Sequence, residues 1–229
     1  MNYKTLLFDI DDTLLDFKAA ETHAISHLLE EMGIAITEER IAQYAAINQV
    51  LWEQFEKGLI QREVLLGKRF EDFFALYGKK VDGQEMDRTF RARLEEGNYL
   101  MEGSLELLES LKQTHDLYAV TNGVSKTQQR RMADSGLRPY FKKVFVSEDT
   151  GYQKPMPEYF DYVFARIASF QKEETLIIGD SLTSDITGGV LAGIDSCWFN
   201  PLKKPNPLSI QPTYEIEQLA DLPALLFQA

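Results

Sequence analysis

Short apolar runs recur along the chain and alternate, over much of its length, with amphipathic stretches. The first run, residues 5–10, ends in carboxylates, a pattern typical of a buried parallel strand. Similar runs follow at residues 117–121, 143–147 and 175–180, with a shorter one at 196–199. Stretches with helical spacing separate them, at residues 104–113, 126–135, 157–168 and 184–192. This alternation predicts a doubly wound α/β fold, with a parallel sheet covered on both faces.

One long segment interrupts the alternation. Between residues 16 and 100 the pattern predicts helices only, at residues 19–32, 38–56, 62–77 and 85–95. We therefore expect an all-helical cap domain over residues 16–100, inserted into a core domain that consists of residues 1–15 and 101–229. The proline-rich residues 201–212 are expected to form a surface loop, and residues 216–227 a last helix.

Composition and charge narrow the class of protein. Hydrophobic residues make up 44% of the chain and charged residues 26%, as in ordinary soluble proteins. No apolar run approaches the roughly 20 residues of a membrane span, and no signal peptide is evident, so we expect a cytoplasmic protein. The net charge of −12 disfavours nucleic acid polymers and membranes as partners. The single cysteine, Cys197, excludes an internal disulfide, and we predict no role for His23, His27 or His115.

The first candidate residues for chemistry are two carboxylates at the end of the first predicted strand. Asp9 and Asp11 lie two positions apart, so in an extended chain both side chains point to the same side. Carboxylates this close repel each other, and a bound cation would relieve the repulsion. A solvated turn with a helix-capping aspartate is the alternative. An EF-hand calcium loop is excluded, because Leu14 stands where that loop requires glycine.

Two further segments could bind an anion. Thr121, Asn122 and Gly123 end the second run, and a hydroxyl followed by exposed N–H groups suits a phosphoryl oxygen. Turn geometry alone also explains such a tripeptide. Lys154 supplies the positive charge that an acidic protein needs for this purpose, although a lysine beside a proline is often only an exposed loop residue.

The last acidic segment follows the fourth predicted strand. Asp180 and Asp185 could supply oxygen ligands to a hard cation, or they could both cap a helix. Each segment alone is a weak signal. In this order, with each at a strand end or in the loop between strands, they closely resemble the four signatures of the haloacid dehalogenase (HAD) superfamily. The resemblance covers nearly the whole chain and implies a Rossmann-like core.

The resemblance also implies a mechanism. Asp9 would be the nucleophile of a phosphomonoester hydrolase and would form an aspartyl-phosphate, with Asp11 as the general acid/base. Magnesium (Mg2+) would be held by Asp9, the backbone carbonyl of Asp11, and Asp180, with Asp185 in support. Thr121 would bind the phosphoryl group together with the neighbouring amides of Asn122 and Gly123, and Lys154 would neutralise its charge. Dehalogenases of the superfamily lack an acid at the position of Asp11, so phosphatase chemistry is favoured.

The helical segment bears on the substrate. Residues 48–58 and 67–70 resemble one branch of the superfamily, bacterial nucleotidases that hydrolyse pyrimidine nucleoside monophosphates. Within it we predict that Trp52 and Phe55 contact the substrate, although their helical spacing also fits a role in the core of the cap. The expected partner is thus a small phosphate ester, a nucleoside 5'-monophosphate. One alternative is a phosphatase for a small metabolite such as phosphoglycolate or a sugar phosphate. Another is a non-catalytic ligand-binding protein of this fold. The complete set of motif residues argues against the non-catalytic protein.

Overall fold

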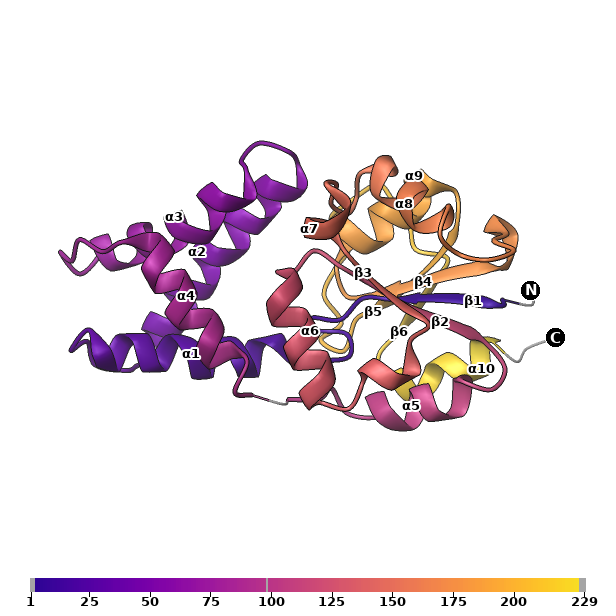
Figure 1. Ribbon diagram of the computed structural model, residues 1–229, viewed down its shortest axis with the longest axis horizontal. Coiled ribbons are helices and arrows are strands. Elements are labelled where there is room, and N and C mark those ends of the chain that lie inside the picture. The colour runs from indigo at the N-terminus through magenta and orange to yellow at the C-terminus, as the bar shows by residue number, and fades with distance from the viewer. Residues whose placement is uncertain (1–2, 98, 227–229) are drawn as a thin grey trace. The chain divides into compact units, whose positions relative to one another are not determined.

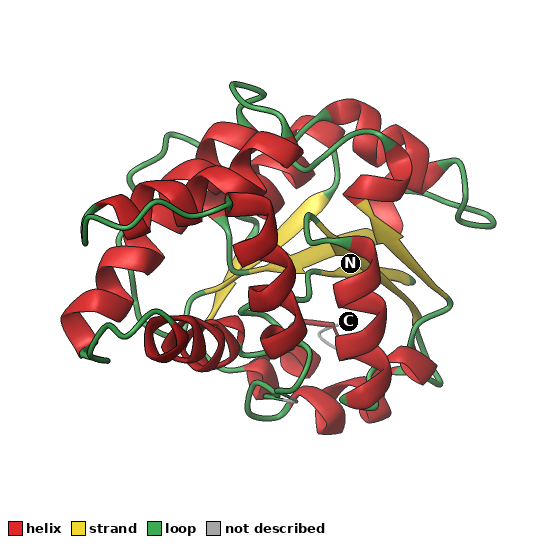
Figure 2. Ribbon diagram, turned by 60° about the vertical axis from the view of Figure 1, so that its left-hand side comes forward, coloured by secondary structure: helices red, strands yellow, loops and turns green. Residues whose placement is uncertain are grey.

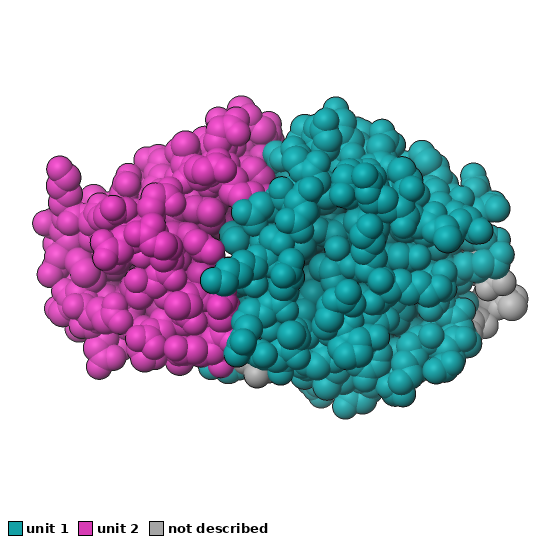
Figure 3. Space-filling view, in the orientation of Figure 1, with its two compact units in different colours: residues 1–16, 99–229 teal, residues 17–98 magenta. Residues whose placement is uncertain are grey.

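The computed structural model describes residues 3–97 and 99–226. The chain divides into two compact units, which Figure 3 distinguishes by colour. Unit 1 consists of Met1–Asp16 and Tyr99–Ala229, and unit 2 is the continuous segment Phe17–Asn98. Unit 1 carries the strands, whereas the described part of unit 2 contains helices alone. The role of unit 2 as a cap over an active site stays a prediction.

The described part of unit 1 is built around a six-stranded sheet with the strand order β3-β2-β1-β4-β5-β6 (Figure 1). All five pairs of neighbouring strands are parallel. The strands are β1 (Thr5–Phe8), β2 (Asp116–Thr121), β3 (Lys143–Val146), β4 (Thr175–Gly179), β5 (Asp195–Phe199) and β6 (Tyr214–Ile216). Because β1 lies between β2 and β4, with Phe8 opposite Ala119 and Ile178, the residues that follow these three strands meet at one edge of the sheet.

Helices cover both faces of this sheet, as the sequence predicted (Figure 2). They are α5 (Ser104–Leu111), α6 (Ser125–Asp134), α7 (Ser147–Thr150), α8 (Pro157–Phe164), α9 (Thr187–Ala192) and α10 (Leu222–Leu226). Successive side chains of β1 point to opposite faces. Leu6 and Phe8 therefore join the core under α5 and α10, whereas Leu7 packs with the apolar face of α8 in a second core.

The end of the chain differs from the prediction of a helix over residues 216–227. Instead β6 pairs with β5, a 3-10 turn covers Leu219–Asp221, and only α10 is helical; Phe227 lies outside the described residues. Ile216, Leu219 and Leu222 all enter the core under the sheet. These three positions have the three-residue spacing of a helix, but Ile216 belongs to the edge strand β6.

Unit 2 has its own core. It is formed by α1 (Phe17–Glu31), α2 (Glu38–Glu56), α3 (Arg62–Ala75) and α4 (Gly83–Leu94). Tyr44 from α2 lies 5.5 Å, between ring centroids, from both Phe70 and Phe90. Helices α3 and α4 approach closely, since a Cβ atom on Gly83 would lie 2.3 Å from the carbonyl oxygen of Gly67. Within residues 3–97 and 99–226, every helix falls short of the length and apolar character that crossing a membrane requires.

Candidate active site

The candidate residues of unit 1 gather where β1, β2 and β4 end. Asp9 directly follows β1, and its backbone N–H donates to the carbonyl of Ile178 at 2.9 Å, so it continues the strand beside β4. Thr121 is the last residue of β2. Asp180 follows β4, and its N–H donates to the hydroxyl of Thr13 at 3.1 Å. In parallel sheets ligands bind beyond the carboxyl ends of the strands, which is where these side chains lie.

Lys154 connects two of the predicted carboxylates. Its Nζ atom lies 2.5 Å from Oδ1 of Asp9 and 2.6 Å from Oδ1 of Asp185, and it donates to the carbonyl of Val120 at 2.9 Å. The residue is only 1% exposed. Burial alone would lower the pKa of the ammonium group, but the charges of Asp185 and Asp9 overcome this and raise it above its ordinary value. Lys154 is therefore a fixed positive charge inside the site.

The carboxylates of Asp9, Asp180 and Asp185 form a compact acidic group. One oxygen from each lies within 4.8 Å of the other two. Burial, and next the charge of Asp185, raise the pKa of Asp9 well above its ordinary value even though Lys154 acts in the opposite direction. Such an oxygen-rich group of mutually repelling carboxylates is what a hard divalent cation prefers.

A glycine makes the approach of Asp185 possible. A Cβ atom on Gly179 would lie 2.2 Å from Oδ2 of Asp185, far inside van der Waals contact. The same carboxylate oxygen accepts from the N–H of Ser181 at 3.1 Å. Asp180 is held by its backbone, since Nε1 of Trp198 donates to its carbonyl at 2.9 Å. Asp185 is thus positioned by the turn that follows β4, and Asp180 by a contact with β5.

The Thr-Asn-Gly segment after β2 is tied to the lysine loop. The side-chain amide of Asn122 accepts from the N–H of Lys154 and donates to its carbonyl, both at 2.9 Å. The N–H of Gly123 donates to Oγ1 of Thr121 at 3.0 Å. The side chain of Asn122, predicted to bind substrate, therefore fixes the backbone that carries Lys154. A contact of this segment with substrate stays a prediction.

Asp11 is held by two residues of α6 for which the sequence predicted no role. Nε2 of Gln128 donates to Oδ2 of Asp11 at 2.7 Å, and Nη1 of Arg131 forms an ion pair with Oδ1. Gln128 also donates to Oγ1 of Thr121 at 2.9 Å, which links the ends of β1 and β2. Only 1% of Gln128 and 2% of Arg131 is exposed. Their spacing of three places them on one face of α6 with the buried Met132. Long polar side chains on an otherwise buried helix face could have indicated in the sequence that these two residues have a buried partner.

The two predicted substrate contacts of unit 2 lie on α2. The rings of Trp52 and Phe55 are 5.8 Å apart in an edge-to-face arrangement. The guanidinium of Arg62, from α3, lies over the Phe55 ring at 4.7 Å. Phe55 is 6% exposed, so most of its surface is buried. A role for these two residues in substrate binding stays a prediction.

Comparison with known proteins establishes the class. Residues 6–199 match the family described as Haloacid dehalogenase-like hydrolase, so the chain belongs to this family. The predicted family and the predicted α/β fold are both confirmed.

Three relatives cover nearly the whole chain. A HAD-hydrolase named YfnB from Bacillus subtilis is 54% identical over 96% of this chain and 94% of its own. A crystal structure of YfnB, described as bound to magnesium, has a TM-score of 0.94 at 53% identity and covers 99% of this chain and 100% of that one. Pyrimidine 5'-nucleotidase PynA of Streptococcus pneumoniae is 43% identical over 97% of this chain and 94% of its own. Pyrimidine 5'-nucleotidase YjjG of Escherichia coli is 30% identical over 99% of both chains. With the family match, these relatives confirm the predicted class of enzyme, a HAD-type phosphatase.

Proposed function

We propose that the protein is a Mg2+-dependent nucleoside 5'-monophosphatase that prefers pyrimidine nucleotides. The observation that carries the chemistry is the contact of Lys154 with both Asp9 and Asp185 at the carboxyl end of the sheet. It provides a buried carboxylate beside a fixed cation, as nucleophilic attack on a phosphate requires. The proposed substrate is supported by PynA and YjjG, two pyrimidine 5'-nucleotidases that align over nearly the full length of both chains.

The acidic group fits the proposed magnesium ion. Its three carboxylates are hard oxygen ligands, and burial and next the charge of Asp185 raise the pKa of Asp9 even though Lys154 opposes the rise. Asp9, Asp180 and the backbone carbonyl of Asp11 would hold the ion, with Asp185 in support. Once bound, the ion would neutralise charge on the phosphoryl oxygens.

In the proposed first step a carboxylate oxygen of Asp9 attacks phosphorus and the bond from phosphorus to the ester oxygen breaks. Asp11 protonates the leaving alcohol, and an aspartyl-phosphate remains. In the second step Asp11 takes a proton from water, which attacks the same phosphorus. The bond between phosphorus and the Asp9 oxygen breaks, so inorganic phosphate leaves and the Asp9 carboxylate is regenerated. Lys154 holds one oxygen of Asp9 and reduces the repulsion between the carboxylate and the incoming phosphate.

Gln128 and Arg131 complete this mechanism as positioning residues. Together they contact both oxygens of Asp11, so they fix where its proton can be given or taken. Gln128 also contacts Thr121, whose hydroxyl would bind the phosphoryl group together with the amides of Asn122 and Gly123. The acid/base group and the phosphoryl-binding segment are thereby held in register.

The substrate side of the proposal concerns unit 2. We propose that residues 17–98 act as the cap and that Trp52 and Phe55 contact the base. The face of an aromatic ring offers a flat apolar surface against which a pyrimidine stacks, and Trp52 and Phe55 place two such rings side by side on α2.

The test is phosphate release from UMP, dUMP, TMP, AMP, phosphoglycolate and glucose 6-phosphate, with Mg2+ and then with EDTA. We expect release to be fastest from the pyrimidine monophosphates and to stop in EDTA. Faster release from phosphoglycolate or glucose 6-phosphate would retain the chemistry and reject the nucleotidase. Absence of turnover on every substrate, with ligand binding preserved, would favour a binding protein of the same fold.

A further inference from the structure

Two histidines without a predicted role meet a glutamate in unit 2. His23 and His27 are four residues apart on α1, so their side chains share one face of the helix. Their ring centroids lie 4.8 Å apart. Glu96, just beyond α4, places Oε2 at 3.7 Å from Nε2 of His23. One ligand atom from each of the three residues lies within 4.8 Å of the other two.

We propose that His23, His27 and Glu96 form a binding site for a borderline transition-metal cation, with Zn2+ as the reference ion. Imidazole suits Zn2+, Ni2+ and Cu2+, whereas Mg2+ prefers oxygen ligands. Three protein ligands would leave the fourth tetrahedral position to water. The site therefore differs in donor chemistry from the all-carboxylate group of unit 1 and selects a different class of ion.

The spacing of His23 and Glu96 needs little adjustment to accept the ion, and the ligand atom of His27 lies within 4.8 Å of both. Zinc ligands lie about 2.0–2.2 Å from the metal, so two ligand atoms of a tetrahedral site are roughly 3.4 Å apart. The separation of 3.7 Å between His23 and Glu96 is already close to this value. The side chains of His23 and Glu96 are 34% and 50% exposed, so both can rotate toward an ion that enters from solvent.

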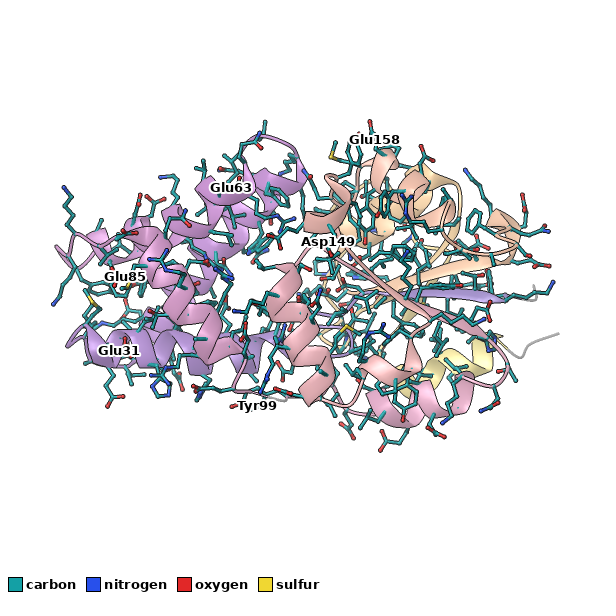
Figure 4. The ribbon with its side chains drawn as sticks, viewed as in Figure 1. Glu31, Glu63, Glu85, Tyr99, Asp149 and Glu158 are labelled. Carbon is teal, nitrogen blue, oxygen red and sulfur yellow. The ribbon has the colours of Figure 1, made fainter. Side chains whose placement is uncertain are left out.

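Arg93 orients the glutamate for this purpose. Its Nη1 atom donates to Oε1 of Glu96 at 3.0 Å, while the other carboxylate oxygen faces His23. Nη2 of Arg93 also lies 3.5 Å from Glu31, at the end of α1 and labelled in Figure 4. A hydrogen bond to the outer oxygen of a ligating carboxylate is the usual support of a metal site.

The site would join the two ends of unit 2. Helix α1 begins at Phe17, where the chain enters unit 2, and Glu96 lies three residues before Tyr99, where unit 1 resumes. An ion held by both segments binds the folded state more tightly than the unfolded chain. Saturation with Zn2+ should therefore raise the melting temperature by about 5 °C.

The experiment is calorimetric titration of the full-length protein with ZnCl2 near neutral pH, in excess MgCl2 so that the acidic group of unit 1 is occupied. Thermal melts with and without ZnCl2 accompany it. We expect one Zn2+ ion per chain. His23→Ala and His27→Ala should each weaken binding more than tenfold, and the isosteric Glu96→Gln about tenfold. The control is Glu95→Gln, an adjacent carboxylate outside the cluster, which should bind as the wild type does.

Two results would overturn the site. One is unchanged Zn2+ affinity in the double variant His23→Ala/His27→Ala. The other is equal weakening by Glu95→Gln and Glu96→Gln, which would indicate a general charge effect. Circular dichroism of each variant establishes that it is folded before its affinity is compared, and Glu96→Gln, which preserves side-chain size, remains decisive if a histidine variant is unstable. Neither result depends on the proposed phosphatase activity.

Discussion

Both units bury charged side chains, but they balance them differently. In unit 2 the carboxylate of Asp87 accepts from Arg69 at 2.6 Å and from Arg91 at 2.7 Å. Arg69 also donates to Asn48, which in turn donates to Glu21 at 2.6 Å. In unit 1, Lys154 pairs with Asp9 and Asp185, and Asp180 places a carboxylate oxygen within 4.8 Å of an oxygen from each of these two aspartates.

The difference separates a network that serves the fold from one that serves a ligand. A buried carboxylate with two arginines has its charge and its hydrogen bonds satisfied within the protein, and removing a partner is costly. Burial and next the charge of Asp185 raise the pKa of Asp9 even though Lys154 opposes the rise, so the neighbouring carboxylates repel each other. A bound cation would relieve this repulsion, whereas the network around Asp87 pairs its charges within the protein.

The largest effect should follow from Asp9→Asn. Loss of the nucleophile should reduce kcat by about 10⁴-fold or more. Because the change removes one of three repelling carboxylates, the free energy of unfolding in EDTA should not fall. Phosphate release and urea denaturation measure the two effects. Retained turnover would contradict the proposed nucleophile, and a large loss of stability would contradict the interpretation of the group as unbalanced.

Arg69→Met should produce the opposite pattern in unit 2. It leaves Asp87 with one arginine and Asn48 without its donor, so we expect the free energy of unfolding to fall by about 3 kcal/mol. Urea denaturation checks this value. Lys68→Met is the matched control, because Lys68 pairs with Asp72 at 2.8 Å on the surface and should contribute less than about 1 kcal/mol. Equal effects of the two changes would refute the contrast between the units.

Arg131→Met tests the positioning of Asp11. We expect kcat to fall about 10²-fold with little change in KM, because the acid/base group loses its orientation while substrate binding is retained. The pH dependence of kcat should shift as well, a change that a purely structural residue would not produce. Arg130→Met is the control, since Arg130 pairs with Asp134 on the surface at 2.5 Å. If both variants keep the wild-type pH profile, Arg131 does not position Asp11.

The smallest effect is expected for Trp52→Ala. It should raise KM for UMP about tenfold while activity on an aryl phosphate such as p-nitrophenyl phosphate changes little, since loss of one stacking ring affects only the base. Steady-state kinetics of wild type and variant on both substrates measure this difference. Equal losses on both would show that Trp52 supports unit 2 rather than the substrate.

Apolar runs in the sequence predicted most of the sheet because its strands are buried on both faces. The run at residues 175–180 corresponds to β4, and the short one at 196–199 to β5. Strand β6 was missed, since it has three residues and its central Glu215 is exposed. The helix predicted over residues 157–168 ends earlier, at Phe164, because local spacing does not reveal where tertiary packing ends a helix.

Prediction of the site residues had the same limit, because local sequence patterns do not reveal tertiary contacts. Motifs at strand ends predicted that Asp9, Asp180 and Asp185 lie together, since a parallel sheet brings the ends of its neighbouring strands together, and the structure places them so. Their role in catalysis stays a prediction. Gln128 and Arg131 could not be identified, because the contact with Asp11 depends on how α6 docks against the sheet. The pairing of His23 with Glu96 likewise depends on the packing of α1 against α4, which no local pattern encodes.

The central position of β1 also has a consequence for synthesis of the chain. The strand that leads to Asp9 is made first, but its partners β2 and β4 begin only at Asp116 and Thr175. On the ribosome, unit 2 is continuous in sequence and can fold while β1 still lacks both neighbours. A chain truncated before β4 would leave one edge of β1 exposed to pair with other chains. Incomplete products should therefore aggregate rather than accumulate as inactive enzyme.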